Sequence, residues 1–593
     1  MRPRRLAASL GLTLAASLVA VRAIPVSAVH GGDTEVTVGS NDLVFSQNKQ
    51  NEPAIAIDPS EPSVVVAGAN DNLDLEACGA GDPTTCPFTE NVGVTGVQFS
   101  FDSGDTWVQA AYTGWTARHC LGPDECVPEE GPIGTLPGFF EAGLVSDGDP
   151  AMAFGPQPGE DGSFSWDNGS RLYFATLTSR HSAVSVEEPF RGFEAIAVSR
   201  LDGEEGGSLT PDIVADQSNW LPPVIASQRQ SGTTFADKEQ IWVDNAESSP
   251  FFGNVYVCFA QFRSAAFAAA PLMVSRSEDG GDTWLQRQVT GAHNVPPTRW
   301  GQSGCTIRTD SEGTAYVLFE QFQSPFRFLP PEGTLMMVRS TDGGRSWTRP
   351  EPVVDVTDPC FFVDPITFRC VMDGVAGARN DLSAAPSVDI ANGAPTGQGA
   401  TDEIVLTWVD GRDGLNDEHV MFSYSTDGGE TWADPVAVES DPGDRGYYSA
   451  PAISPDGTDV YLVYNAFLTP FQEDTSQPRL IVGVVLHSDI DAEGAPTGWT
   501  ELHRGDPGDA RGSSQNNLVA GFLGDYVYAD ATNDVAVAVW NDAREASNCE
   551  AIDEWRMTIR EDDPSAAPPA VQDECQTTFG NTDIFGWSGA DPT

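Results

Sequence analysis

The chain has 593 residues, of which 40% are apolar and 9% aromatic. This composition excludes a coiled coil and a mostly disordered chain, and the length, roughly four times that of a common domain, requires several domains or one large repetitive architecture. Asp and Glu number 87 against 31 Lys and Arg, a net charge of −56, which disfavours nucleic acid and anionic membrane surfaces as partners. We attribute the scarcity of lysine, with only Lys49 and Lys238 present, to coding bias or salt adaptation.

Residues 1–28 are predicted to be a signal peptide. Three arginines within the first five residues precede an apolar run from Leu6 to Val21, and Val-Ser-Ala at 26–28 has the small-residue spacing of a cleavage site. No other stretch approaches the roughly 20 apolar residues that a membrane span needs. We therefore expect a secreted, extracellular protein with no membrane span after signal removal. A retained anchor and a twin-arginine signal are the alternatives.

All ten cysteines lie after the signal, and an even number in an oxidising compartment predicts disulfides. Local spacing favours four short bridges, which leaves Cys258 and Cys305 as the fifth pair. The four are Cys78–Cys86, Cys120–Cys126, Cys360–Cys370 and Cys549–Cys575. A metal site is one alternative, although the sequence has no CxxC motif and no histidine cluster, and free buried thiols are another.

Four segments repeat the pattern SxDxGx(T/S)W. They begin at Ser100, Ser277, Ser340 and Ser425, and their aspartates are Asp102, Asp279, Asp342 and Asp427. In a hairpin turn such an Asp accepts backbone N–H bonds, the Gly permits a positive φ, and the Trp packs beneath as an anchor. We assign these residues a structural role, because a catalytic acid would not be needed four times.

Seven pairs of short strands, each joined by a Gly, Asp or Pro turn, recur along the chain. They are 53–58 with 64–70, 150–154 with 172–177, 240–244 with 254–259, 305–309 with 314–320, 386–390 with 404–410, 451–454 with 460–464, and 526–531 with 535–540. Each unit is long enough for a four-stranded antiparallel sheet, and such sheets arranged radially form a β-propeller. The last unit lacks one strand, so we expect a strand near Asp42 to Ser46 to complete it and close the ring.

The SxDxGxTW segments are identified as Asp-boxes, and the chain from about Asn51 to Trp587 resembles exported bacterial members of the BNR-repeat, sialidase-like β-propeller superfamily. Four further segments carry the resemblance: NEPAIAIDP at 51–59, GNVYVCFAQF at 253–262, SYSTDGGETWADP at 423–435 and GDYVYADAT at 524–532. The resemblance implies one all-β propeller domain over residues 29–593, with disulfide-tied loop insertions at about 72–148 and 545–580. Family sialidases have six blades, whereas the strand pairs predict seven, with six as the alternative.

The resemblance also implies a type of site. Family sialidases hold the sugar carboxylate with three arginines, attack the anomeric carbon with a Tyr paired to a Glu, and use an Asp as acid/base. The first of these arginines belongs to an RIP motif on the first strand, but the matching strand, NEPAIAID, carries no arginine, and RAIP at 22–25 lies in the signal. One third of the substrate clamp therefore has no matching position.

Candidate site residues lie near the ends of the predicted inner strands, which converge on the centre of a propeller. For substrate binding they are Arg379, Arg412, Arg544 and Tyr448, and for catalysis they are Tyr526, Glu320 and Asp149. The related runs WVDGR at 408–412 and WNDAR at 540–544 also fit structural salt bridges with Asp410 and Asp542. For the tyrosines, packing in the core is the alternative.

Acids recur immediately before four of the inner strands, at Glu52, Asp149, Asp237, Glu239 and Asp525. One hypothesis is an axial ring of carboxylates, suited to acid/base chemistry or to Ca²⁺, a hard cation that takes oxygen ligands. The alternative is that these acids hydrogen-bond the adjacent backbone. The sequence has no EF-hand, HExxH or phosphate-binding glycine motif, and we predict no other cofactor.

Two classes of function are consistent with these features. The first is a secreted, sialidase-like exo-glycoside hydrolase acting on glycans, in which Arg379 binds the carboxylate and Tyr526 or Tyr448 works with Glu320. The second is a non-catalytic secreted propeller that binds a glycan or a protein. The negative charge disfavours an anionic sugar unless a compact arginine cluster overcomes it, since charges beyond roughly 8 Å are screened at 0.15 M salt. Three arginines in one pocket would favour the enzyme, and a carboxylate-only pocket would favour the scaffold or a metal site.

Overall fold

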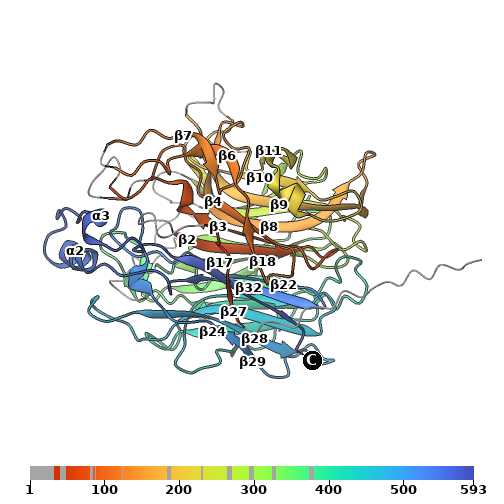
Figure 1. The fold of residues 1–593 in the computed structure, drawn as a ribbon. Coiled ribbons are helices and arrows are strands. Elements are labelled where there is room, and N and C mark those ends of the chain that lie inside the picture. The colour runs from red at the N-terminus through yellow and green to blue at the C-terminus, as the bar shows by residue number, and fades with distance from the viewer. Residues whose placement is uncertain are drawn as a thin grey trace, which may run out of the picture.

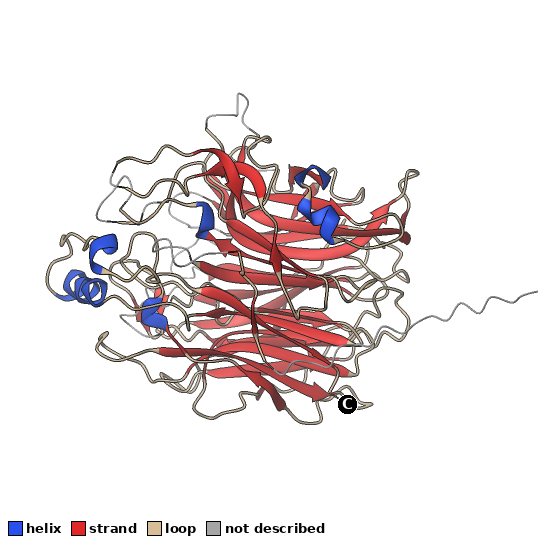
Figure 2. Cartoon of the chain, viewed as in Figure 1, coloured by secondary structure: helices blue, strands red, loops and turns tan. Residues whose placement is uncertain are grey.

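The computed structural model describes residues 32–39, 49–79, 85–86, 88–122, 124–182, 189–228, 231–263, 270–292, 300–323, 329–372 and 379–592. They form a seven-bladed β-propeller of antiparallel, four-stranded sheets, which confirms the predicted all-β fold. Strands fill the body of the molecule, and the few helices lie at its periphery (Figure 1, Figure 2). No described helix is long and apolar enough to cross a membrane.

Each blade runs from an inner strand at the axis to an outer strand. Blade one consists of β2 (Gln50–Ile57), β3 (Val65–Asp71), β4 (Thr95–Ser100) and β5 (Val108–Gln109), and blade two of β8 (Leu144–Pro158), β9 (Phe164–Arg180), β10 (Ala195–Asp202) and β11 (Trp220–Ile225). Blade three consists of β12 (Thr234–Val243), β13 (Val255–Arg263), β14 (Leu272–Ser277) and β15 (Leu285–Gln288), and blade four of β16 (Trp300–Thr309), β17 (Ala315–Gln323), β18 (Glu332–Ser340) and β19 (Glu351–Thr357). Blade five consists of β22 (Ser387–Ile390), β23 (Ile404–Asp410), β24 (His419–Ser425) and β25 (Val436–Ala437), and blade six of β26 (Arg445–Ile453), β27 (Asp459–Phe467), β28 (Leu480–Asp489) and β29 (Thr500–Arg504), with β30 (Gly508–Asp509) beside β28. The inner strands pack against one another in this order around the axis.

The seventh blade joins the two ends of the described chain. It consists of β31 (Tyr528–Ala531), β32 (Val535–Asp542), β33 (Asp583–Ala590) and β1 (Thr34–Glu35). Strand β1 pairs antiparallel with β33, with Thr34 opposite Gly586. The predicted closing strand near Asp42 to Ser46 lies outside the described residues, and in the structure the ring is closed by Thr34–Glu35 instead.

Connections within and between blades carry the remaining elements. They are the hairpins β6 (Tyr112–Thr116) with β7 (Glu129–Ile133) and β20 (Phe362–Val363) with β21 (Cys370–Val371), the short helices η1 (Asn72–Asp74), α1 (Pro211–Ala215), η2 (Gln217–Asn219) and η3 (Ala510–Gly512), and α2 (Glu550–Glu561) and α3 (Val571–Glu574) between β32 and β33. All five predicted disulfides are present. Helices α2 and α3 are bracketed by one of them, Cys549–Cys575.

The four SxDxGx(T/S)W segments form the same turn between the third and outer strands of their blades. After β14, Ser277 Oγ donates to Asp279 Oδ1 (2.7 Å) and accepts from the Gly281 N–H (2.8 Å). Asp279 also accepts from the Thr283 N–H (2.9 Å) and hydroxyl (2.6 Å). The motif glycines all have positive φ: Gly104 91°, Gly281 88°, Gly344 76° and Gly429 78°. The motif side chains thus satisfy the backbone of a turn that a residue with a Cβ would strain.

Apolar side chains fill the space between neighbouring blades. Trp408 of β23 is fully buried against Leu335 and Met337 of the preceding blade, and Trp540 of β32 is buried against Tyr461 and Val463. Because each blade buries its faces against two neighbours, the ring fixes the positions of the inner strands around the axis.

Replacing Gly344 by Ala is expected to destabilise the protein by about 1–3 kcal/mol, because its φ is 76° and the added Cβ would lie 2.9 Å from Tyr256 Cε1. The matched control is Gly207→Ala, where the nearest atom would be 3.6 Å away and φ is not in the positive region. Thermal melting of both variants and the wild type makes the comparison. Equal melting temperatures for Gly344→Ala and the wild type would contradict this account of the turn.

Candidate functional site

The inner strands share an irregularity at the axis. In five blades the pairing between the inner strand and its neighbour shifts register. In three of these bulges a non-glycine residue has positive φ: Glu52 at 54°, Asp149 at 51° and Lys238 at 59°. Such backbone strain clusters at functional sites, and bulges re-aim side chains. Blades one, two and three therefore each direct one charged side chain toward the axis.

The Lys238 ammonium group is surrounded by carboxylates. Its Nζ lies 2.9 Å from Asp149 Oδ2 and 2.8 Å from Asp525 Oδ2, with Asp237 at 3.7 Å and Glu52 at 3.9 Å. The Lys238 side chain is 13% exposed, and that of Asp525 is fully buried. Since Asp525 precedes β31, this one ammonium group connects four blades.

A second cation completes the axial cluster. Arg379, which precedes β22, forms a bidentate pair with Asp525, with Nε–Oδ1 3.0 Å and Nη2–Oδ2 2.6 Å. Its guanidinium also lies 3.7 Å from Glu52 Oε1 and 4.4 Å from the ring centre of Phe522. The Tyr448 hydroxyl donates to the Arg379 carbonyl (3.2 Å) and to Asp525 Oδ1 (3.4 Å). Asp525 thus receives donors from three side chains of the cluster.

The cluster separates the pKa values of its acids. Burial alone would raise the pKa of Asp525, but Arg379 and Lys238 hold it well below its usual range. Burial also opposes ionisation of Asp149, but Lys238 and a hydrogen bond from Glu52 lower its pKa. Burial and the neighbouring Asp149 raise the pKa of Glu52 well above its usual range. The pKa values of Glu52 and Asp149 are thus shifted in opposite directions, and a pair with separated pKa values is the pattern of an acid and a base.

A cavity of about 480 Å³ adjoins the cluster, within the size range of small-molecule sites. Its walls include the amides of Asn51, Asn70, Asn72, Gln515, Asn516 and Asn517, the cations Lys49, Arg369 and Arg379, the aromatic rings of Phe88 and Phe522, and one acid, Asp147. Amides both donate and accept hydrogen bonds, as hydroxyl groups do. The walls therefore suit a polyhydroxylated ligand, and they carry three cations in a protein whose net charge is −56.

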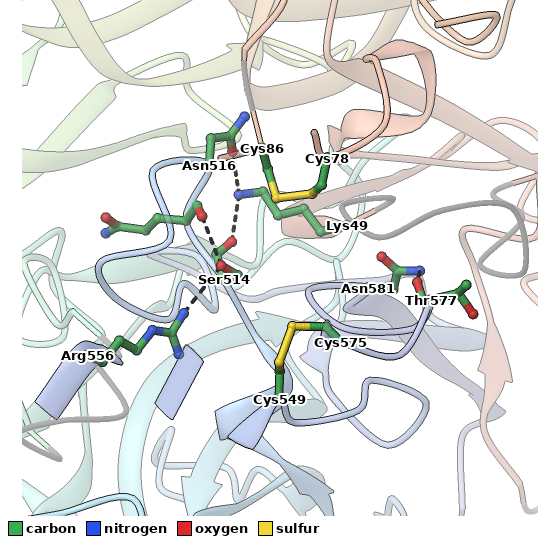
Figure 3. Close-up of a disulfide and its surroundings, with 11 residues drawn as sticks. Lys49, Cys78, Cys86, Ser514, Asn516, Cys549, Arg556, Cys575, Thr577 and Asn581 are labelled. Carbon is green, nitrogen blue, oxygen red and sulfur yellow. Dashed lines mark hydrogen bonds between the residues drawn. A yellow bond between two sulfur atoms is a disulfide. The ribbon is translucent and has the colours of Figure 1, made fainter. Parts of the chain in front are cut away.

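Lys49 is held in the cavity wall by neutral groups. Its Nζ donates to the Ser514 carbonyl (2.8 Å) and to Asn516 Oδ1 (2.7 Å) (Figure 3). Burial lowers the pKa of Lys49 to about 7. The other cations of the wall are paired with acids, since Arg369 Nη1 lies 2.8 Å from Asp381 Oδ2 and Arg379 binds Asp525.

A smaller cavity of about 60 Å³ lies on the other side of the Arg379–Asp525 pair, lined by Lys238, Glu239, Tyr448, Asp525 and Tyr526 among others. Burial, Asp149 and Glu52 raise the pKa of Tyr526 well above its usual range. Both carboxyl oxygens of Glu239 lack a hydrogen-bond partner among the described residues. Arg379 faces the large cavity and Asp525 the small one, so this ion pair is the partition between them.

The structure brings together four of the residues that the sequence proposed for the site: Asp149, Arg379, Tyr448 and Tyr526. The other three lie elsewhere. Arg412 Nη2 lies 2.5 Å from Asp410 Oδ2, which also accepts from Trp408 Nε1.

Arg544 repeats this arrangement with Asp542 and Trp540, and it also contacts Asp33 at 2.6 Å. Glu320, on β17, forms a buried pair with Asp358, and burial and Asp358 raise the pKa of Glu320 well above its usual range. Neither arginine nor Glu320 lines the two axial cavities.

The sequence analysis missed Lys238, Lys49 and Arg369 as site residues. The two lysines carried a signal that was available, because they are the only ones in the chain. An axial ring of carboxylates is one of the two sequence-based interpretations of Glu52, Asp149, Asp237, Glu239 and Asp525. In the structure Lys238 Nζ lies within 3.9 Å of Glu52, Asp149, Asp237 and Asp525, so the chain itself places a cation among these acids.

No family model matches the chain, and no curated protein matches it. Solved structures that resemble it include the Hadza microbial sialidase Hz136 (13% identity, TM-score 0.38, 70% of this chain and 63% of that one) and Trypanosoma rangeli sialidase in complex with the inhibitor DANA (12%, 0.37, 75% and 55%). Another is the phage phi92 endosialidase (9%, 0.37, 95% and 69%). The chain spans less than two thirds of the length of the first two.

Replacing Lys238 by Met is expected to destabilise the protein by about 3–5 kcal/mol, because it leaves buried carboxylates without their counter-charge. The control is Arg345→Met, which removes an exposed ion pair with Glu278 and is expected to cost about 0–1 kcal/mol. Urea unfolding midpoints of the two variants provide the measurement. A Lys238 variant as stable as the Arg345 variant would show that the axial cluster does not hold the blades together.

The Glu320–Asp358 pair predicts a pH dependence of stability. Burial raises the pKa of Asp358 from 3.8 to about 7, so the folded protein keeps a proton that the unfolded chain releases. This contribution to stability is fully present below pH 3.8 and is lost as the pH rises through 7. Asp358→Asn should therefore be more stable than the wild type at pH 8, by on the order of 2 kcal/mol.

Thermal melting of Asp358→Asn, of the wild type and of Glu205→Gln, an exposed acid, at several values between pH 4 and 8 tests this. The gain should grow with pH for Asp358→Asn alone. A gain that is constant with pH would contradict the proposed titration.

Proposed function

We propose that the protein is a secreted glycoside hydrolase that binds the end of a glycan chain in the large axial cavity and cleaves the terminal glycosidic bond. The observation that carries this proposal is the Glu52–Asp149 pair. The pKa of Glu52 is raised and that of Asp149 is lowered, and the pair lies near Tyr526 and a cavity walled by amides. The five disulfides support an oxidising, extracellular location.

In the proposed reaction each axial group has one role. Glu52 donates its proton to the oxygen of the departing sugar as the bond from the anomeric carbon to that oxygen breaks. Asp149 accepts the proton of the Tyr526 hydroxyl as the Tyr526 oxygen forms a bond to the anomeric carbon. Water then releases the sugar from Tyr526 in the reverse sense.

The finer assignment is a sialidase-type enzyme, which removes an acidic sugar. It is supported by the two arginines of the cavity wall, Arg369 and Arg379, and by Lys49, whose pKa of about 7 leaves it partly charged, against the single acid Asp147. Within a Debye length, a compact cluster of this kind can outweigh the negative field of the whole protein. In this assignment the sugar carboxylate takes the place of Asp525 on Arg379 and thereby opens the partition between the cavities. Sequence reasoning placed Glu320 beside the tyrosine nucleophile, and Glu52 takes that position in the present proposal.

A non-catalytic, glycan-binding propeller is the second candidate. One observation favours it: Glu52 is only 1% exposed, and the Arg379–Asp525 pair stands between the large cavity and Tyr526. If that pair never opens, the cavity binds a sugar without cleaving it.

The test is hydrolysis of 4-methylumbelliferyl glycosides by the purified protein, with N-acetylneuraminide, arabinofuranoside and galactoside among them. The variants are Glu52→Gln, Asp149→Asn and Tyr526→Phe, and each is expected to lower kcat about 10²–10⁴-fold. The control is Asp244→Asn. Asp244 is a buried acid with a raised pKa that accepts a hydrogen bond from the Ser249 hydroxyl and lines neither axial cavity.

Turnover that is lost in the three variants and kept in Asp244→Asn would support the enzyme. Absence of turnover on every glycoside, from protein with the wild-type melting profile, would reject catalysis and leave the binding propeller. Turnover of the neuraminide alone would support the sialidase-type assignment.

A further inference from the structure

The hairpin formed by β20 and β21 presents an aromatic side chain in an unusual way. Phe368, at its tip, is 65% exposed and has a φ of 57°. Exposure of a large apolar side chain and a positive φ in a bulky residue are both unfavourable, and strained positions persist only where the surrounding structure holds them. The neighbouring residues Ile366, Thr367 and Arg369 line the large cavity, so the exposed Phe368 belongs to a cavity-lining segment.

The hairpin is fixed by three separate tethers. Cys360–Cys370 closes its base. Asp364 Oδ1 accepts from the N–H groups of Ile366 (2.9 Å) and Thr367 (2.7 Å), which holds the tip. Asp364 Oδ2 accepts from Arg560 Nε (2.7 Å) of helix α2, and both side chains of this pair are buried. The exposed ring is therefore presented on a rigid support, which is how proteins prepare an aromatic contact for a ligand.

Phe88 provides a second exposed ring at the same cavity. It lines the cavity, is 52% exposed, and follows the disulfide Cys78–Cys86. That disulfide and Ile366 of the hairpin pack in one apolar cluster with Ile552 of α2. Figure 3 shows the Cys78–Cys86 and Cys549–Cys575 bridges in one region with Lys49, Ser514 and Asn516. The two segments that carry the exposed rings are thus built on one common support.

The remaining aromatic ring of the cavity is already engaged. Phe522 lies under Arg379 at 4.4 Å and near Lys49 at 5.8 Å from its ring centre. The cavity thus offers amides and cations together with exposed aromatic surface from Phe88 in its lining and from Phe368 in the adjoining hairpin. A glycan chain matches both, because its hydroxyl groups bind amides and its sugar rings have apolar faces.

We propose that Phe368 and Phe88 form a second sugar-binding subsite, which holds the penultimate unit of the glycan by stacking on its apolar face. This inference rests on the proposed function, since the terminal unit occupies the cavity. It assigns the two rings a role in recognising chain length. Arg560 is a positioning residue, because it acts on the ligand only through the hairpin.

The probe is an array of immobilised di-, tri- and tetrasaccharides with sialyl, galactosyl, mannosyl and arabinosyl ends, with the matching free monosaccharides as competitors. The wild type is expected to bind an oligosaccharide more tightly than its terminal monosaccharide. Phe368→Ala and Phe88→Ala should each weaken oligosaccharide binding roughly three- to tenfold and leave competition by the monosaccharide unchanged. Phe368→Tyr keeps an aromatic ring and should bind the oligosaccharide as the wild type does. Arg560→Gln should weaken oligosaccharide binding and leave competition by the monosaccharide unchanged.

The control is Leu285→Ala, an exposed apolar residue on the outer strand of the third blade, which should bind as the wild type does. A chain-length preference that survives both Ala variants would overturn the subsite and leave the proposed function intact. Equal affinity of the wild type for oligosaccharide and monosaccharide would do the same. Absence of binding to every sugar would overturn the proposed function, and the subsite with it.

Discussion

The ion cluster around Lys238 is the interaction on which the rest of the site depends. One ammonium group from the third blade contacts acids from the first, second and seventh, and Asp525 carries that contact on to Arg379 ahead of the fifth. Because these groups are removed from water, each charge is tolerable only while its partners are in place. The same contacts therefore fix the angular positions of the blades and set the protonation of Glu52 and Asp149.

Charge is segregated in this molecule. The protein as a whole is strongly acidic, yet its axial cavity gathers Lys49, Arg369 and Arg379 into one wall. The acids that pair with the two arginines, Asp381 and Asp525, are not among the residues that line this cavity.

The fold was predictable because its signals are local. Period-two strands and turn motifs specify each blade, and repetition specifies the ring. The site was only partly predictable, because a bulge decides which residue of a strand faces the axis. At 237–239 the sequence offers two acids flanking Lys238, and only the register shift after Asp237 explains why the lysine is central. Glu320 was chosen by analogy along its strand, but its partner Asp358 comes from a distant connection that no local pattern reveals.

The closure of the ring has a consequence for how the protein reaches its native state. The hydroxyl of Thr37, just beyond β1, accepts from the backbone N–H of Ile584 in β33, across a sequence separation of 547 residues. Contacts between residues so far apart in the sequence form late, because the entropy cost of closing the intervening loop must be overcome first. Blades one to six can assemble on local contacts as an open arc, whose first and last sheets each have one uncovered face. The completed circle, and with it the full set of acids around Lys238, forms only when the final strands arrive.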